Sequence, residues 1–163
     1  MERNIIESFG FKISNFKIDS ESQEYEACTF NLNGKYIVAR TAKQTPKKIG
    51  QFVTLWKRNR SKTISPYSVT DEFDFLLIQV FCANRTGLFL FPKSELALQG
   101  ILSDKKQKGK LGFRVYPDWD FPQNKQAERT KRWMSVYFLE VKLEESKDFE
   151  KTKRFLKEKV GIL

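Results

Sequence analysis

The sequence predicts an α+β fold in which a single domain, residues 1–163, holds a central mixed and curved β-sheet flanked by helices. The first indication is a pair of almost continuously apolar runs, residues 73–83 and 88–91, separated by a polar turn. Strands buried on both faces have this composition, so the two runs are expected to form a hairpin at the centre of the sheet. The second indication is Asn33-Gly34, because this dipeptide favours the tight turn of a β-hairpin. The third is helical spacing of apolar residues elsewhere in the chain.

The N-terminal part is expected to contain one helix and two strands. Residues 2–14 carry apolar side chains at helical spacing, which predicts a short amphipathic helix. These side chains are Ile5, Ile6, Phe9 and Ile13. The polar residues 15–24 are expected to form a loop, and residues 25–32 and 35–42 the two strands that Asn33-Gly34 connects.

Residues 45–58 are predicted to form a helix. Thr45 can accept a hydrogen bond from a free first-turn amide, and Pro46 would stand where its missing N–H costs nothing. Four apolar residues match the buried stripe of such a helix, namely Ile49, Phe52, Val53 and Trp56. The same geometry would turn a polar set to solvent, namely Lys47, Lys48, Gln51, Lys57 and Arg58. A helix start of this kind is expected to attract anions.

Shorter patterns predict the remaining elements. Residues 59–72 are expected to form a polar loop, and Ser94 to cap a short helix that Gly100 ends in the left-handed conformation. Residues 104–110 are predicted to form a charged loop.

The C-terminal part is predicted to be largely helical. A helix is expected over residues 123–134, whereas residues 135–141 fit either its continuation or a last strand. Ser146 is expected to cap a final helix. Its inward side chains would be Phe149, Leu156 and Val160, and its outward ones Lys151, Lys153, Lys157 and Lys159.

The positive charge is concentrated in two blocks. The net charge is +10. Residues 27–70 contain nine Lys or Arg and no acid, and residues 105–137 contain nine more against three acids. A compact fold can place both blocks on one face, and such a polarised surface steers polyanions.

Composition excludes several classes of function. The chain contains no histidine, which removes the usual general base at neutral pH and the commonest transition-metal ligand. Its two cysteines, Cys28 and Cys82, lie within apolar runs and are expected to be reduced thiols, so neither a metal site nor a cofactor is predicted. With no long apolar run and no signal-peptide layout at the N-terminus, we expect a cytoplasmic protein that does not bind a membrane. We also expect a monomer.

The basic and aromatic residues predict contacts to nucleic acid, with DNA favoured. The alternation in residues 111–116 places Arg114 and Tyr116 on one face of a strand, and Tyr116 and Trp119 could stack on the bases of a single strand. The predicted binding residues are Arg40, Lys43, Thr45, Lys47, Lys48, Gln51, Arg58, Lys93, Arg114, Tyr116, Trp119, Lys125 and Arg129. No helix-turn-helix or other recognised DNA-reading motif is present, so sequence-specific reading of duplex DNA is not predicted.

Several segments together resemble the MepB family, a small bacterial family. The longest matching run is residues 45–58, and residues 36–40, 42–43, 91–93, 100–103 and 112–117 also match. The resemblance implies a protein from an operon that pairs a drug-responsive repressor with an efflux pump, and it carries over no catalytic residue. It also implies a fold similar to type IIE restriction endonucleases, whose effector parts bind DNA without cutting it.

Two alternatives to nucleic-acid binding remain open. A restriction-type nuclease needs Pro-Asp followed by (Asp/Glu)-x-Lys, so that two carboxylates hold Mg²⁺. Pro117-Asp118 precedes Glu140-Val141-Lys142 in this order, and Asp74 precedes Asp104-Lys105-Lys106 more loosely. The other alternative is a protein-interaction module whose basic face binds an acidic partner.

Overall fold

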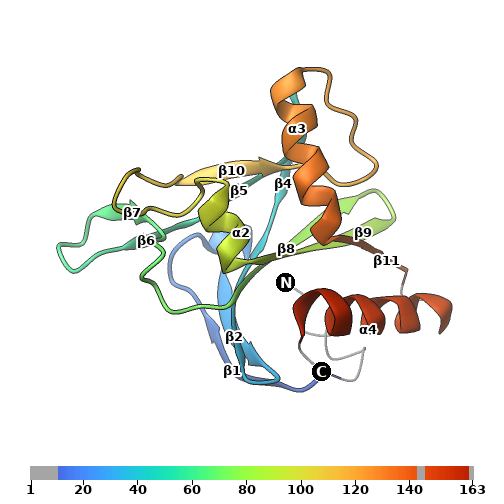
Figure 1. Cartoon of the computed structure of the whole chain (residues 1–163), viewed down its shortest axis with the longest axis horizontal. Helices are drawn as coiled ribbons and strands as arrows, with labels where there is room; N and C mark the ends of the chain where they lie inside the picture. The colour runs from blue at the N-terminus through green and yellow to red at the C-terminus, as the bar shows by residue number, and fades with distance from the viewer. Residues whose placement is uncertain (1–10, 143–145, 162–163) are drawn as a thin grey trace.

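A mixed, curved β-sheet forms the centre of the protein (Figure 1). The computed structural model describes residues 11–142 and 146–161, and within them this sheet has six strands in the order β1-β2-β3-β8-β9-β11. Neighbouring strands are antiparallel, except that β3 and β8 run parallel. The strands are β1 (Ile13–Ile18), β2 (Cys28–Leu32), β3 (Lys35–Thr41), β8 (Phe75–Cys82), β9 (Arg85–Pro92) and β11 (Phe138–Val141). The predicted α+β fold with a mixed sheet is confirmed.

Strands β8 and β9 form the central hairpin, as the two apolar runs predict. Its register pairs Leu76 with Phe91 and Leu77 with Leu90. Because successive residues of a strand point to opposite faces, Leu76 and Phe91 enter one buried apolar cluster, and Leu77 and Leu90 enter another. Burial on both faces explains why these runs lack the polar alternation of a half-exposed strand.

Different elements cover the two faces of the sheet (Figure 1). Helix α4 (Ser146–Val160) covers one face, where its Leu156 joins the cluster that contains Leu77. The other face carries a second sheet, β10-β5-β4, and the helices α2 and α3. These elements are β4 (Lys43–Thr45), β5 (Lys48–Thr54), β10 (Gly112–Val115), α2 (Lys93–Leu98) and α3 (Lys125–Met134). The short elements are η1 (Gln23–Tyr25), η2 (Ser135–Tyr137), β6 (Trp56–Arg58) and β7 (Ile64–Pro66).

The helix predicted for residues 45–58 is wrong, because this segment forms strands β5 and β6. Gly50 has a φ of +85°, which a right-handed helix cannot contain. Strand β5 pairs with β4 on one side and with β10 on the other. Burial follows a period of two, since Gln51, Val53 and Leu55 are all buried. The polar Gln51 interrupted the apolar alternation, so the helical spacing of the other apolar residues dominated the pattern.

The N-terminal helix predicted for residues 2–14 falls mostly outside the described residues, which begin at residue 11. Its last two positions belong to a strand, because β1 starts at Ile13 and pairs with β2. The loop predicted for residues 15–24 is therefore wrong in its first part. Strand β1 contains a register shift, and its Asn15 has a φ of 53°. Most of its side chains are exposed, so apolar alternation does not mark this edge strand.

Several local predictions are confirmed. Asn33 and Gly34 both have positive φ, 47° and 77°, as a type I′ hairpin turn requires. The helix expected over residues 123–134 is α3. Residues 135–141, which fitted either a helix or a strand, divide into the 3₁₀ turn η2 and the strand β11.

The other helices agree with their predictions only in part. Pro92, and not Ser94, is the N-cap of α2, whereas Gly100 has the expected positive φ of 69°. Residues 59–72 contain the short strand β7 besides loop. Helix α4 begins at Ser146, whose predicted capping side chain lies outside the described part, and its Leu156 is buried. The described outward lysines Lys151, Lys153, Lys157 and Lys159 are exposed, while the side chains of Phe149 and Val160 lie outside the described part.

Across residues 11–142 and 146–161, no helix is both long and apolar enough to cross a bilayer. Both thiols are free, with Cys28 buried and Cys82 partly exposed. Burial raises the pKa of the Cys28 thiol, which keeps it protonated at neutral pH.

Candidate functional site

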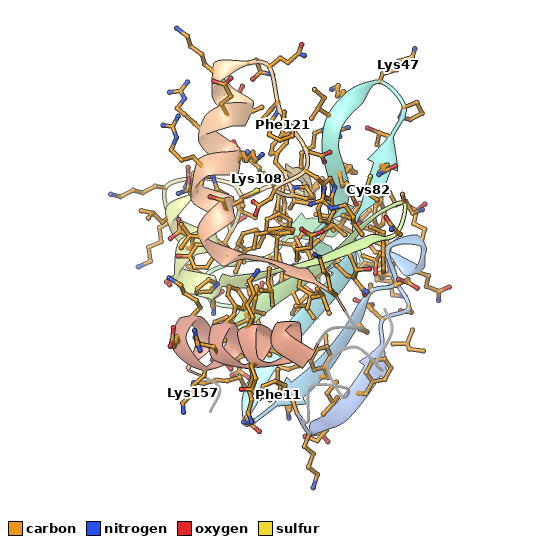
Figure 2. All side chains as sticks on the ribbon, turned by 90° about the vertical axis from the view of Figure 1, so that its right-hand side faces the viewer. Phe11, Lys47, Cys82, Lys108, Phe121 and Lys157 are labelled. Atoms are coloured by element: carbon orange, nitrogen blue, oxygen red, sulfur yellow. The ribbon has the colours of Figure 1, made fainter. Side chains whose placement is uncertain are left out.

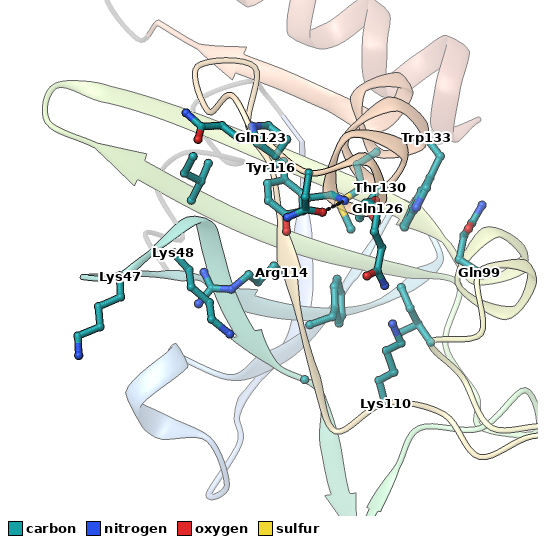
Figure 3. A pocket seen from close by; sticks show the side chains of 18 residues that line it. Lys47, Lys48, Gln99, Lys110, Arg114, Tyr116, Gln123, Gln126, Thr130 and Trp133 are labelled. Atoms are coloured by element: carbon teal, nitrogen blue, oxygen red, sulfur yellow. Dashed lines mark hydrogen bonds between the residues drawn. The ribbon is translucent and has the colours of Figure 1, made fainter.

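A pocket of about 600 Å³ opens between the β10-β5-β4 sheet and helix α3 (Figure 3). Strands β5 and β10 supply one wall, α3 supplies the opposite wall, and the segment after α2 closes a third side. Its charged and polar side chains are Lys47, Lys48, Gln99, Lys110, Arg114, Gln123, Asn124, Gln126 and Thr130. Its aromatic side chains are Phe113, Tyr116 and Trp133. Segments far apart in the sequence therefore combine in one cavity.

The β4–β5 hairpin brings Lys47 and Lys48 to the rim of the pocket. Pro46 and Lys47 lie between Thr45 and Lys48, which pair across the hairpin. Proline suits this position because its fixed φ favours a turn. Both lysines are exposed, and neither has a hydrogen-bond or ion-pair partner among the described residues. Lys48 lies beside Arg114, whereas Lys47 extends outward from the hairpin (Figure 3).

Arg114 is held in place by hydrogen bonds to the same hairpin. Its Nη2 donates to Thr45 Oγ1 at 2.6 Å, and its Nη1 donates to the carbonyl oxygen of Gly50 at 3.2 Å. The guanidinium carbon lies 6.0 Å from the centre of the Phe52 ring. Thr45 therefore positions a cation and does not cap a helix. Since no described carboxylate pairs with Arg114, its charge remains available to a ligand.

Tyr116 packs closely against the backbone of Gly50. A Cβ added at Gly50 would lie 2.7 Å from Tyr116 Cε1, so only glycine leaves room for the ring. Burial raises the pKa of the Tyr116 hydroxyl, and the nearby Arg114 opposes this effect. The phenol thus stays protonated at neutral pH and can donate a hydrogen bond. Among the described residues it has no such partner.

Helix α3 presents one face to the pocket. Asn124 caps the helix, since its Oδ1 accepts a 2.8 Å hydrogen bond from a first-turn amide. Gln126, Thr130 and Trp133 stand four and three positions apart, which puts them on the same side of the helix. Trp133 is anchored to the core, with its ring 5.3 Å from that of Phe91. The side-chain amide of Gln126 has no hydrogen-bond partner in the described part of the chain, so it is available to a ligand.

Lys110 reaches the pocket from a compact loop. Asp104 Oδ1 accepts hydrogen bonds from two amides of this loop, at 2.8 and 2.9 Å. The amide of Lys110 donates to the carbonyl oxygen of Ile101 at 2.9 Å. A Cβ added at Gly109 would lie 2.4 Å from that same oxygen, so the loop needs glycine here. The sequence predicts a charged loop but contains no signal that one of its lysines lines a cavity.

All four charged residues in the pocket lining are cations, namely Lys47, Lys48, Lys110 and Arg114. No aspartate or glutamate contributes to this lining. Elsewhere in the described chain, ion pairs neutralise many basic residues. These pairs are Arg40–Asp19, Lys43–Glu24, Lys57–Asp71, Arg58–Glu21 and Arg85–Glu140. A concave site with uncompensated positive charge concentrates a positive potential, which suits an anionic ligand.

The structure places Arg40 and Gln51 inside the protein, so neither can contact a ligand on the surface. Arg40 is fully buried, donates to the carbonyl oxygen of Ala39 at 2.9 Å and lies 3.7 Å from a carboxylate oxygen of Asp19. Gln51 is 1% exposed and donates to the carbonyl oxygen of Phe81 at 2.8 Å. We therefore remove both residues from the candidate site. Strand alternation explains the error for Gln51, which turns inward beside Val53.

Three other predicted residues are exposed or partly exposed but serve local contacts. Lys43 pairs with Glu24 at 3.5 Å, and Arg58 pairs with Glu21 at 2.5 Å in the region of the β6–β7 hairpin. Lys93 donates to the backbone oxygen of Asp71. None of these cations lines the pocket.

The predicted residues Trp119, Lys125 and Arg129 also lie outside the pocket lining. The ring of Trp119 packs edge to face on Phe138 and lies 4.6 Å below the guanidinium of Arg85. Lys125 and Arg129 are exposed on α3 but do not line the cavity. Of the thirteen residues predicted from the sequence, Lys47, Lys48, Arg114 and Tyr116 line the pocket, and Thr45 supports it.

The buried position of Arg40 gives a prediction that separates it from Arg114. Arg40→Met should leave oligonucleotide affinity unchanged within about twofold, because Arg40 is fully buried, but it should lower the melting temperature, since removing one partner of a buried ion pair leaves Asp19 without its counter-charge. Arg114→Met should lower the affinity by about tenfold, since it removes one phosphate contact. Fluorescence anisotropy and thermal melting measure both effects. If Arg40→Met lost as much affinity as Arg114→Met, the assignment of Arg40 to the protein interior and of Arg114 to the binding site would be wrong.

Three of the four carboxylates of the nuclease alternative have partners in the structure, whereas the exposed carboxylate of Asp118 has none among the described residues. Glu140 accepts hydrogen bonds from Arg85 Nε and Nη2 at 2.7 and 2.8 Å, which lowers the pKa of its carboxyl. Asp74 Oδ2 accepts from the amide of Tyr36, and Asp104 organises the loop before Lys110. No group of three or more Asp, Glu, Cys or His side chains suited to a metal ion occurs among the described residues.

Comparison with known proteins identifies the family. A family model described as MepB-like matches residues 19–140. The crystal structure of MepB is similar at 36% sequence identity and a TM-score of 0.78, covering 86% of this chain and 97% of MepB. A bacterial homing endonuclease aligns at 15% identity over 82% of this chain and 84% of its own, but its TM-score of 0.42 is too low to carry an argument. No curated protein sequence matches. This chain therefore belongs to the MepB-like family.

Proposed function

We propose that this protein binds nucleic acid, with DNA as the first ligand to test, and does not cut it. The pocket between β10 and α3 would receive part of the ligand, and Lys47, Lys48, Lys110 and Arg114 would contact its phosphates. The observation that carries this proposal is a cavity of about 600 Å³ whose charged lining consists of four cations and no acid.

Two further features support a nucleic acid over a simple inorganic anion. Aromatic side chains share the cavity with the cations, and bases stack on aromatic rings whereas inorganic anions do not. Cationic residues also continue beyond the pocket. Lys105, Lys106 and Lys108 are exposed in the loop that carries Lys110, and Lys125 and Arg129 are exposed on α3. An extended polyanion could use these charges, but a small ion could not.

The salt dependence of binding tests this proposal. Four phosphate contacts predict that affinity falls by about 50- to 150-fold between about 50 and 200 mM salt, because binding releases condensed counterions. Titrating the protein into a labelled oligonucleotide at both concentrations measures the slope. The absence of binding at about 50 mM salt would contradict the proposal.

The geometry supports the two alternatives less well. The bidentate contact from Arg85 occupies Glu140, so a metal ion would have to displace an arginine. We therefore expect DNA to remain intact during long incubation with Mg²⁺ or Mn²⁺. An acidic protein partner would not need the aromatic part of the pocket. If a captured protein stays bound after nuclease treatment, and if Lys48→Glu abolishes its capture, a protein-interaction module would be favoured instead.

Membership of the MepB-like family extends the proposal to a biological context. We infer an accessory role alongside a drug-efflux operon, in the cytoplasm. Deleting the gene and measuring both drug resistance and transcript levels of the neighbouring genes would test this role.

A further inference from the structure

We propose that the pocket accepts one unstacked base of a single-stranded nucleic acid, while the neighbouring phosphates lie on the cationic rim. This inference rests on the proposed function, and it specifies which form of nucleic acid binds and which part enters the cavity. The argument depends on the volume of the cavity, its lining and the surface that adjoins it.

The volume is too large for a phosphate group alone. Cavities of roughly 300 to 1,000 Å³ accommodate ligands of drug size, and this one measures about 600 Å³. A phosphate held on Lys48 and Arg114 would leave the part next to Trp133, on the α3 side, empty. A nucleotide fills both parts.

The lining offers the two kinds of contact that a base makes. Phe113 and Tyr116 are buried and Trp133 is half-buried, which provides apolar aromatic surface. The side-chain amides of Gln123 and Gln126 and the hydroxyl of Tyr116 have no hydrogen-bond partner in the described chain. Proteins recognise an unstacked base by stacking it on aromatic side chains and by forming hydrogen bonds to its edges. Figure 3 shows Gln126 and Trp133 on the α3 side of the cavity, facing the cations of the sheet.

An aromatic strip beside the pocket favours a strand over a free nucleotide. The ring of Phe52 lies 6.0 Å from the guanidinium carbon of Arg114, and the ring of Tyr25 packs edge to face on Phe52 at 6.3 Å. A Cβ added at Gly112, which lines the pocket, would lie 2.7 Å from Phe52, so the strip borders the cavity directly. Lys43 lies 4.9 Å above Tyr25. A free nucleotide would leave this strip unused, whereas the next nucleotides of a strand can stack on it.

A base must leave the duplex stack before it can enter such a cavity. Extruding a paired base costs unpairing and unstacking energy, whereas a single strand already presents bases in this form. The pocket therefore favours single-stranded over duplex ligands of equal length. Either DNA or RNA can satisfy this requirement.

The test compares labelled ligands of about 12 nucleotides at about 50 mM salt: a single-stranded DNA, its RNA counterpart, a strand with the same phosphates but abasic sugars, and a duplex. We expect the base-bearing strands to bind at least about tenfold more tightly than the abasic strand, since stacking of even one base contributes on this order. Gln126→Ala should reduce this preference several-fold and leave binding of the abasic strand unchanged. Asn84→Ala, which removes an exposed side-chain amide in the turn between β8 and β9 that does not line the pocket, is the matched control.

Each other outcome overturns the inference. Equal affinity for base-bearing and abasic strands, with strong salt dependence, would exclude a base in the pocket but leave the proposed function standing. Tighter binding of the duplex would have the same consequence. If a mononucleotide competes as well as the full strand, the ligand of the pocket is a free nucleotide and not a strand. Failure of every ligand to bind would reject this inference and the proposed function together.

Discussion

Replacing Lys48 and Lys110 together by glutamate is expected to weaken oligonucleotide binding on the order of a hundredfold or more at about 50 mM salt. These lysines lie on different sides of the pocket, come from β5 and from the loop after α2, and have no described carboxylate partner. Each substitution removes one cation and adds an acid to a cavity lined by none. The slope of log affinity against log salt concentration should become shallower by the amount expected for the loss of about two phosphate contacts. Anisotropy titrations across a salt series measure both quantities.

The matched control is Lys151→Glu with Lys157→Glu on α4. Both lysines are exposed, and α4 covers the face of the sheet opposite the pocket. Figure 2 shows Lys157 at the far end of the molecule from Lys47. Each Lys→Glu change lowers the net charge by two, so either pair takes it from +10 to +6. If both double variants lose affinity equally, overall charge and not the pocket determines binding.

Gly50→Ala is expected to lower the free energy of unfolding by about 2–4 kcal/mol, because two costs combine. Gly50 has a φ of +85°, where an L-residue with a Cβ is strained. Its new methyl group would also lie 2.7 Å from Tyr116 Cε1 and 3.0 Å from the carbonyl oxygen of Val115. Denaturant unfolding measures the loss. Because Tyr116 must move, the variant should also bind oligonucleotide more weakly under conditions where it is folded.

Gly34→Ala separates the two costs. Gly34 has a similar φ of +77°, but nothing lies within 4 Å of an added Cβ. It should therefore lose only the conformational part, on the order of 1–2 kcal/mol. In a double-mutant cycle, Tyr116→Ala should relieve part of the cost of Gly50→Ala. Additive effects in this cycle would show that the contact between Gly50 and Tyr116 is not the cause.

Local chemistry was sufficient to predict the elements whose signal comes from their own residues. The apolar runs of β8 and β9 reflect burial on both faces, and Asn33-Gly34 supplies the positive φ values that its turn requires. Strand β5 could not be predicted in this way. Its conformation depends on pairing with β4 and β10 and on the bond from Gln51 to Phe81, and these are contacts between distant segments. Tertiary pairing overrides helical spacing in such a case.

The candidate site was predictable to a smaller extent. Charge density directs attention to Lys47, Lys48 and Arg114, and the fold brings these three residues into one cavity. Charge density cannot distinguish an available cation from one paired inside the protein, which is why Arg40 was included. Lys110 and Trp133 were missed because their role depends on the way the loop and α3 close the pocket. Neither residue carries a sequence signal for this position.

An NMR titration of the isotope-labelled protein with a single-stranded oligonucleotide tests the central claim most directly. The chain is 19.2 kDa, a size at which amide resonances can be assigned. We predict that the largest shift changes occur in residues 47–50, 110–116 and 123–133, with α4 and the β6–β7 hairpin unchanged. Changes centred on α4 or on β6 and β7, with residues 110–116 unaffected, would contradict the assignment of the ligand to this pocket.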